Sequence, residues 1–170
     1  MIGTHTKRML RNKKGNAILD TAMVVVVLVI FALLSVITWS VWEDIYPDMS
    51  AEMDSVEAQE SLDVINDRYP SLFDGLFLFV FIGLWIMTLV ASFMIDSHPI
   101  FFAISLVLFV IVLIGSVYIG NFYEEIVTDS SFDDAYEDFP ATHFILTNLL
   151  MFSIVIGSSI MLVLYGKSRQ

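Results

Sequence analysis

Residues 17–42 read AILDTAMVVVVLVIFALLSVITWSVW and contain a single charged side chain, Asp20. At a rise of about 1.5 Å per residue, a helix of this length would be about 39 Å long, more than the roughly 30 Å hydrocarbon core of a bilayer. A chain surrounded by lipid must satisfy its own backbone hydrogen bonds. We therefore expect this segment to be a membrane-spanning helix.

Three further apolar runs follow, at residues 75–95, 100–120 and 143–165. None of them contains Lys, Arg or Glu, and each is long enough to cross a bilayer as a helix. Strands of a membrane barrel would instead alternate in polarity over about ten residues. The sequence therefore predicts an all-α membrane domain that comprises residues 1–170 and has four transmembrane helices.

Charge is strongly segregated along the chain, whose formal net charge is −11. The acidic residues gather in the two segments between spans that we interpret as acidic loops, residues 43–74 and 121–142. Lys and Arg mark the cytoplasmic flanks of membrane helices, so we expect both tails on the cytoplasmic side, as an even number of spans requires. The basic residues of the tails are Lys7, Arg8, Arg11, Lys13, Lys14, Lys167 and Arg169.

Each acidic loop has a periodic apolar pattern that predicts a short amphipathic surface helix. In the first loop, apolar residues recur at steps of three and four from Asp48 to Tyr69, with Pro70 past the expected end. In the second, the pattern covers residues 132–139, with Pro140 opening the fourth span. Trp39 and Trp42 precede the first loop and are typical of an interfacial aromatic belt.

The sequence lacks the motifs of the common catalytic and metal sites. There is no cysteine, and the three histidines have no metal-ligand spacing. Neither a phosphate-binding glycine loop nor a G-x-S-x-G motif occurs. We therefore predict no catalytic residue, no metal, no cofactor and no sequence-specific nucleic acid partner. A transporter also needs ionisable groups near the midplane, and the middle of every expected span lacks one.

Small and polar residues within the last two spans are candidates for helix packing. Such residues allow helices to approach closely or to form hydrogen bonds with one another. Packing inside one bundle is the favoured interpretation, and contact between copies in a homo-oligomer is the alternative. The candidates are Ser116, Gly120, Asn148, Ser153 and Gly157.

Two resemblances bear on function. The stretch KKGNAILD at residues 13–20, followed by an apolar run, resembles a type IV prepilin leader, with Asp20 at the place of the family's acidic residue. Three further spans are foreign to pilins, so we interpret this stretch as a basic flank and a helix start. The segments 96–102, 139–144 and 164–167 resemble small membrane proteins of tailless viruses that carry an internal lipid membrane.

The viral resemblance implies a structural protein that links a virion's internal membrane to its capsid. We therefore expect a non-enzymatic scaffolding protein, whose partners are membrane lipids and a capsid or other membrane protein. The alternative is a small cellular transporter or channel component, with Asp20, Asp96 and His98 as its polar pathway. The residues expected to contact the partner or lipid headgroups are Lys7, Arg8, Arg11, Lys13 and Lys14.

Overall fold

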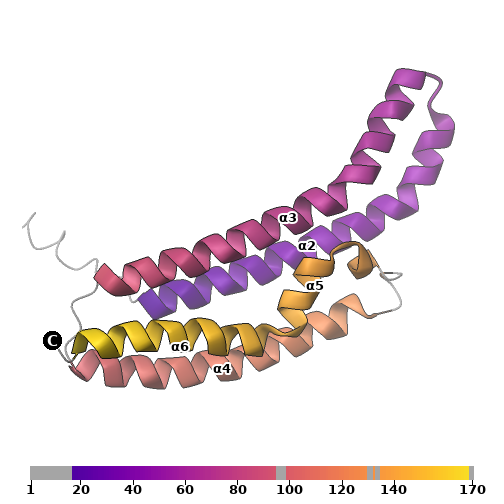
Figure 1. Ribbon diagram of the computed structural model, residues 1–170. Coiled ribbons are helices and arrows are strands. Elements are labelled where there is room, and N and C mark those ends of the chain that lie inside the picture. Colours follow the sequence, from indigo (N-terminus) through magenta and orange to yellow (C-terminus); the bar gives the residue numbers. More distant parts are fainter. Residues whose placement is uncertain (1–16, 95–98, 130–131, 133–134, 169–170) are drawn as a thin grey trace, which may run out of the picture.

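The computed structural model describes residues 17–94, 99–129, 132 and 135–168, which are drawn in colour in Figure 1. These residues form helices joined by short connections, and no strand occurs among them. The helices are α2 (Ala17–Glu52), α3 (Val56–Met94), α4 (Pro99–Val127), the 3₁₀ helix η3 (Ala135–Asp138), α5 (Pro140–Thr147) and α6 (Leu149–Ser168).

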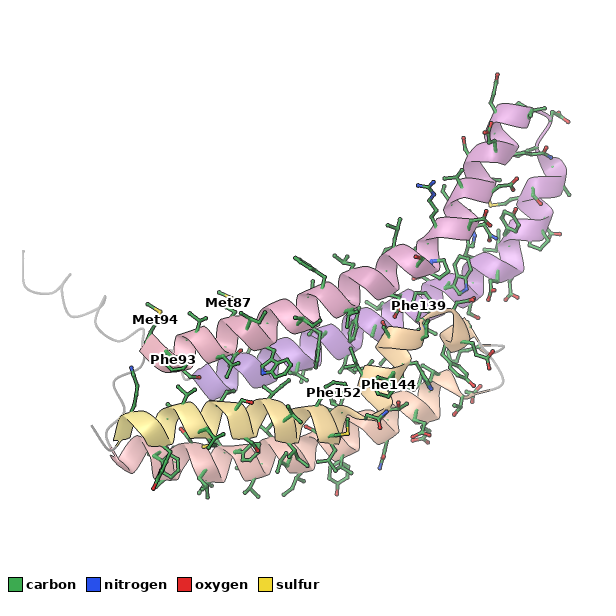
Figure 2. All side chains as sticks on the ribbon, viewed as in Figure 1. Met87, Phe93, Met94, Phe139, Phe144 and Phe152 are labelled. Atoms are coloured by element: carbon green, nitrogen blue, oxygen red, sulfur yellow. The ribbon has the colours of Figure 1, made fainter. Side chains whose placement is uncertain are left out.

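Four of these helices are long and apolar enough to cross a membrane, as predicted. The qualifying segments are Val25–Glu52, Val56–Met94, Phe102–Val127 and Leu149–Lys167. At most a third of the side chains in each apolar window are buried within the chain, and Met87 and Met94 of α3, for example, project outward (Figure 2). Helices that face lipid have this character, because hydrocarbon offers their apolar side chains the same environment as a protein core.

The helices form two antiparallel pairs. Helix α2 packs along α3, α4 packs along α6, and contacts of α3 with α6 and of α2 with α4 join the pairs (Figure 1). The start of α2 and the end of α6 lie at the same end of the bundle, here called the terminal end. The opposite end carries the α2–α3 turn, η3 and α5, and is called the acidic end.

The first acidic loop differs from its prediction. Residues 43–52 continue α2, and α3 begins at Val56 and runs through Pro70 without interruption. No separate surface helix therefore lies between Asp48 and Tyr69; the two spans are prolonged into a helical hairpin that bends away from α4 and α6 (Figure 1). Pro47 and Pro70 lie within these helices, and proline bends a helix because it lacks an amide hydrogen.

The short turn of this hairpin is fixed by local hydrogen bonds. The Ser55 hydroxyl accepts a hydrogen bond from the Ala58 amide at 3.3 Å, as an N-cap residue does. The Gln59 side chain donates to the Ser50 carbonyl at 3.0 Å across the turn.

The second acidic loop and the fourth span also differ in detail. Within the expected helix over residues 132–139, the described residues include the 3₁₀ turn Ala135–Asp138, whereas residues 133 and 134 lie outside the described part of the chain. Pro140 does open the next helix, as predicted, but the expected span 143–165 is divided at Asn148 into α5 and α6. Asn148 has φ −104° and ψ 25°, outside the α-helical region, so the chain changes direction there.

The largest fully buried side chains gather near the acidic end, where η3 and α5 pack against α2, α3 and α4. They are Tyr123, Phe77, Phe139, Leu146, Val36 and Val127. Aromatic rings dominate this part of the core: Tyr69 stacks on Phe73 with ring centroids 4.2 Å apart and meets Phe139 edge-on at 6.5 Å. This packing holds η3 and α5 against α3.

Candidate functional site at the acidic end

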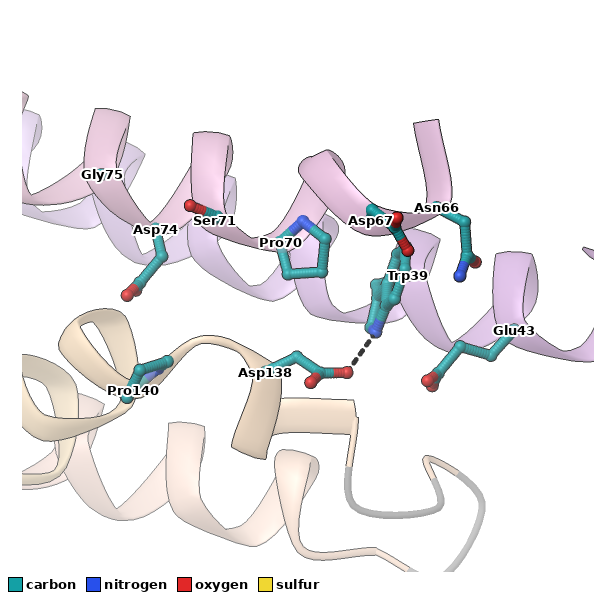
Figure 3. Close-up of a pocket in the computed structure, with 10 residues that line it drawn as sticks. All are labelled: Trp39, Glu43, Asn66, Asp67, Pro70, Ser71, Asp74, Gly75, Asp138 and Pro140. Carbon is teal, nitrogen blue, oxygen red and sulfur yellow. Dashed lines mark hydrogen bonds between the residues drawn. The ribbon is translucent and has the colours of Figure 1, made fainter. Parts of the chain in front are cut away.

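A hollow of about 620 Å³ opens at the acidic end, between the α2–α3 pair and the η3–α5 segment (Figure 3). Its wall contains four carboxylates but no Lys or Arg, so a positively charged group would be favoured there. We call it the acidic hollow. Its lining residues are Trp39, Glu43, Asn66, Asp67, Pro70, Ser71, Asp74, Gly75, Asp138 and Pro140.

Trp39 connects α2 to η3 inside this hollow. Its indole nitrogen donates a hydrogen bond to Asp138 Oδ2 at 2.6 Å (Figure 3), and its ring stacks on Tyr69 at 5.5 Å. Trp39 is only 4% exposed. The predicted aromatic belt is therefore wrong for this residue, because its ring is buried within the chain rather than lying at the lipid surface.

Two further hydrogen bonds join α2 to α3 toward the tip of the hairpin. Trp42 Nε1 donates to Asn66 Oδ1 at 3.0 Å, and the Tyr46 hydroxyl donates to Asp63 Oδ1 at 2.5 Å. With Trp39, these aromatic residues form a series along one side of α2, at steps of three and four residues. The series fixes the two helices relative to each other where they leave the bundle.

Asp74 is the most buried carboxylate of the described residues. It is 8% exposed and accepts hydrogen bonds from the backbone amides of Ala141 at 3.0 Å and Thr142 at 2.7 Å. These amides belong to the first turn of α5, where helix N–H groups have no partner within the helix. Phe139, at the N-cap position, makes no side-chain cap. Asp74 of α3 therefore serves as the N-cap of α5, and its negative charge suits the helix dipole.

Near Asp74 lie three polar aromatic side chains from α4, η3 and α5: Tyr123, which is buried, and Tyr136 and His143, which are half-buried. The ring of His143 lies 5.9 Å from that of Tyr123 and 4.7 Å from that of Tyr136. Burial lowers the pKa of His143, while Glu124 and Glu137 act in the opposite direction. Since burial is the largest influence, the ring favours its neutral form.

Four of the predicted packing residues, Ser116, Gly120, Ser153 and Gly157, lie where α4 meets α5 and α6. The hydroxyl oxygens of Ser116 and Ser153 are 2.6 Å apart and form a hydrogen bond between the helices. A Cβ at Gly157 would overlap the ring of Phe109, and one at Gly120 would lie 3.1 Å from the Leu146 carbonyl oxygen.

Asn148 plays a more local part than the predicted bond to a neighbouring helix. Its side-chain nitrogen donates to the Phe144 carbonyl at 2.9 Å and lies 3.3 Å from the Thr147 hydroxyl. The Thr147 hydroxyl in turn donates to the His143 carbonyl at 2.7 Å. These bonds satisfy carbonyl groups of the last turn of α5, where the helix is interrupted.

The residues of the predicted basic contact, Lys7, Arg8, Arg11, Lys13 and Lys14, lie outside the described residues. So do Asp96 and His98 of the alternative polar pathway. Asp20 lies in the first turn of α2, at the terminal end of the bundle, where a helix-start residue is expected.

Sequence reasoning missed the roles of Asp74, Trp39 and Lys167. The Lys167 ammonium donates to the Phe93 carbonyl, so α6 caps the end of α3 at the terminal end of the bundle. One signal for Asp74 was available: the segment FPAT at residues 139–142 starts a helix after proline without a capping side chain of its own. Such a helix needs an acceptor from elsewhere in the chain.

Comparisons of the chain with protein-family models, with curated proteins and with solved structures give no match.

Proposed function

We propose that this chain is a non-enzymatic scaffolding protein of a membrane, which presents a rigid acidic projection to a partner protein. The observation that carries this proposal is the length of the first hairpin. Helix α2 has 36 residues, or about 54 Å, and therefore exceeds a hydrocarbon core of roughly 30 Å by about 24 Å. Residues 43–52 account for about 15 Å of this excess. Together with the start of α3 they form the segment 43–69, here called the acidic arm.

The composition of the acidic arm and the hydrogen bonds that hold its two helices together suit a docking role. It carries nine carboxylates, and Arg68 is its only basic residue. Exposed apolar side chains lie among the charges, notably Val56 at 79% and Ile65 at 49% exposure. The hydrogen bonds of Trp42 and Tyr46 to α3 hold the arm in one shape, so a partner would lose little entropy in ordering it.

The setting that we propose is the internal membrane of a virion, with the arm on one side and the basic tail on the other. This setting rests on the resemblance of the second half of the chain to small membrane proteins of tailless viruses. In this arrangement Lys7, Arg8, Arg11, Lys13 and Lys14 contact anionic headgroups or a shell protein. Neighbouring genes for a capsid protein and a packaging ATPase would support this setting, whereas a transport operon would contradict it.

Photo-crosslinking from single positions tests the docking role. A photoreactive amino acid at Val56, in the arm, should give a protein adduct in the native membrane or particle. The matched control is Phe79, which is 75% exposed but lies in the apolar part of α3 and should give lipid adducts. If Val56 gives no protein adduct, or if both positions give the same adducts, the docking role is wrong.

A transporter or channel component is the second candidate, and one observation favours it. Helix α5 is separated from the fourth span, α6, at Asn148, and its first turn meets a buried carboxylate, Asp74, as in transporters whose broken helices bind substrates. The span hydroxyls, however, bond to carbonyls of their own helices, as Thr88 and Ser92 do. Loss of a proton-dependent flux in reconstituted Asp74→Asn protein, with assembly intact, would favour transport over scaffolding.

A further inference from the structure

Two buried polar atoms lie beside the Asp74 cap of α5. They are the hydroxyl oxygen of Tyr123, a residue with 0% exposure, and Nδ1 of His143. Neither atom has a hydrogen-bond partner among the residues that the structure describes. Buried polar groups in proteins are nearly always hydrogen-bonded, to protein or to ordered water, because an unpaired one costs stability.

The two atoms belong to residues that lie close to Asp74. The Tyr123 and His143 rings are 5.9 Å apart, and the residue before His143 donates its amide to Asp74 Oδ1. Each oxygen of Asp74 accepts one backbone hydrogen bond, which leaves further acceptor positions on the carboxylate.

We propose that Asp74, Tyr123 and His143 form a buried binding site for one water molecule. The Tyr123 hydroxyl donates to the water oxygen, and the water donates its two hydrogens to Asp74 and to Nδ1 of neutral His143. Three hydrogen bonds are the usual number for a buried water. The assignment requires the His143 proton on Nε2, so that Nδ1 is an acceptor.

The location of the site gives water a way in. Asp74 lines the acidic hollow, which is open to the outside at the acidic end (Figure 3). From there, water reaches the carboxylate from one side, while Tyr123 and His143 approach from α4 and α5. The ionisable groups that act on His143 are Glu124 of α4 and Glu137 of η3. Both favour a positive charge on the ring, and burial opposes it.

Radiolytic footprinting of the full chain in lipid nanodiscs tests this site without any substitution. Radiation converts bound water into hydroxyl radicals where the water lies, so Tyr123 should be oxidised despite its 0% exposure. Phe139 and Phe77, which are 1% and 2% exposed in apolar surroundings, are the controls and should be modified far less. Modification of Tyr123 no greater than that of these two residues would overturn the proposal.

The variant Tyr123→Phe gives an independent test, because the sign of its effect differs between a hydrated and a dry site. With water bound, loss of the hydroxyl should lower the Tm by about 2–4 °C and reduce oxidation of His143. In a dry site, the variant removes an unpaired polar group, and the Tm should rise. A rise contradicts the proposal, and so does a lower Tm without footprinting of Tyr123, which would indicate a direct bond to Asp74.

Discussion

Asp74 and Thr142 are 68 positions apart, yet the Thr142 amide donates a hydrogen bond of 2.7 Å to the Asp74 carboxylate. This bond and its neighbour from Ala141 fasten the start of α5 to the middle of α3. At the C-terminal end of α3, Lys167 of α6 donates to the Phe93 carbonyl. Helices α5 and α6 are thus each joined to α3 through a charged group that complements a helix dipole.

The first prediction concerns this cap. Asp74→Ala leaves two amides of α5 without an acceptor, and should cost about 1–3 kcal/mol of stability. Asp74→Asn should lose much of the same stability, because the side-chain NH₂ group, itself a donor, would face one of the two backbone amides. The control is Asp63→Asn, which affects an exposed bond to Tyr46 and should change little. Thermal unfolding in detergent measures both; equal effects at the two positions would contradict the role of Asp74.

The α4–α6 contact provides a second prediction. Gly157→Ala puts a methyl group into the ring of Phe109, and overpacking of this kind should cost about 1–3 kcal/mol. Gly115→Ala is the matched control, because a Cβ there has nothing within 4 Å and alanine favours a helix. We expect a lower Tm for the first variant and an unchanged or slightly higher Tm for the second. Two equal shifts would show that this glycine is not needed for packing.

The third prediction concerns pH and His143. Because burial lowers the pKa of His143, the unfolded chain binds a proton on this ring more readily than the folded one. The neutral ring therefore contributes folding stability at pH values above the pKa of histidine in the unfolded chain, about 6.5. This contribution is lost as the pH falls through the lowered pKa of the folded state. A pH series of Tm values for the wild type and His143→Gln measures the contribution of this ring. The wild type should lose more stability on acidification, and parallel curves would contradict the assignment.

A fourth prediction tests the basic tail as a contact rather than only as an orientation signal. Neutralising Lys7, Arg8 and Arg11 while keeping Lys13 and Lys14 should preserve the topology and weaken retention in the assembly. Each basic residue near an anionic surface contributes about 1 kcal/mol, which salt reduces. Co-purification over a salt series measures retention. The control exchanges the same three residues between Lys and Arg, and retention of the neutralised variant equal to that of this control would refute the contact.

Hydropathy predicts the four spans because solvation by lipid acts on each segment separately. Asp74 binds amides that lie 67 and 68 residues later in the chain, and Trp39 binds a carboxylate that lies 99 residues later. Neither role follows from the local sequence pattern. Proline was interpreted as the end of a helix, but Pro70 continues one, since tertiary packing holds α3 on both sides of it. A single Asn148 in an apolar run is too weak a signal to predict that the expected span 143–165 is divided into two helices.

The last prediction concerns topology, for which the sequence itself provides a clean experiment. The chain has no cysteine, so a single introduced cysteine is the only target of a thiol reagent. Ser61→Cys lies on the acidic arm and Gly166→Cys near the end of α6, and both positions are exposed. In intact cells, a membrane-impermeant maleimide should label Ser61→Cys at once, and Gly166→Cys only after permeabilisation. This follows because Lys and Arg of the tails stay in the cytoplasm, while the arm at the opposite end of the bundle is carried across the membrane.

Two outcomes would contradict this topology. Labelling of Gly166→Cys in intact cells, with protection of Ser61→Cys, would show the inverted orientation, with the acidic arm on the cytoplasmic side. Equal labelling of both positions from one side would contradict the four-span arrangement itself.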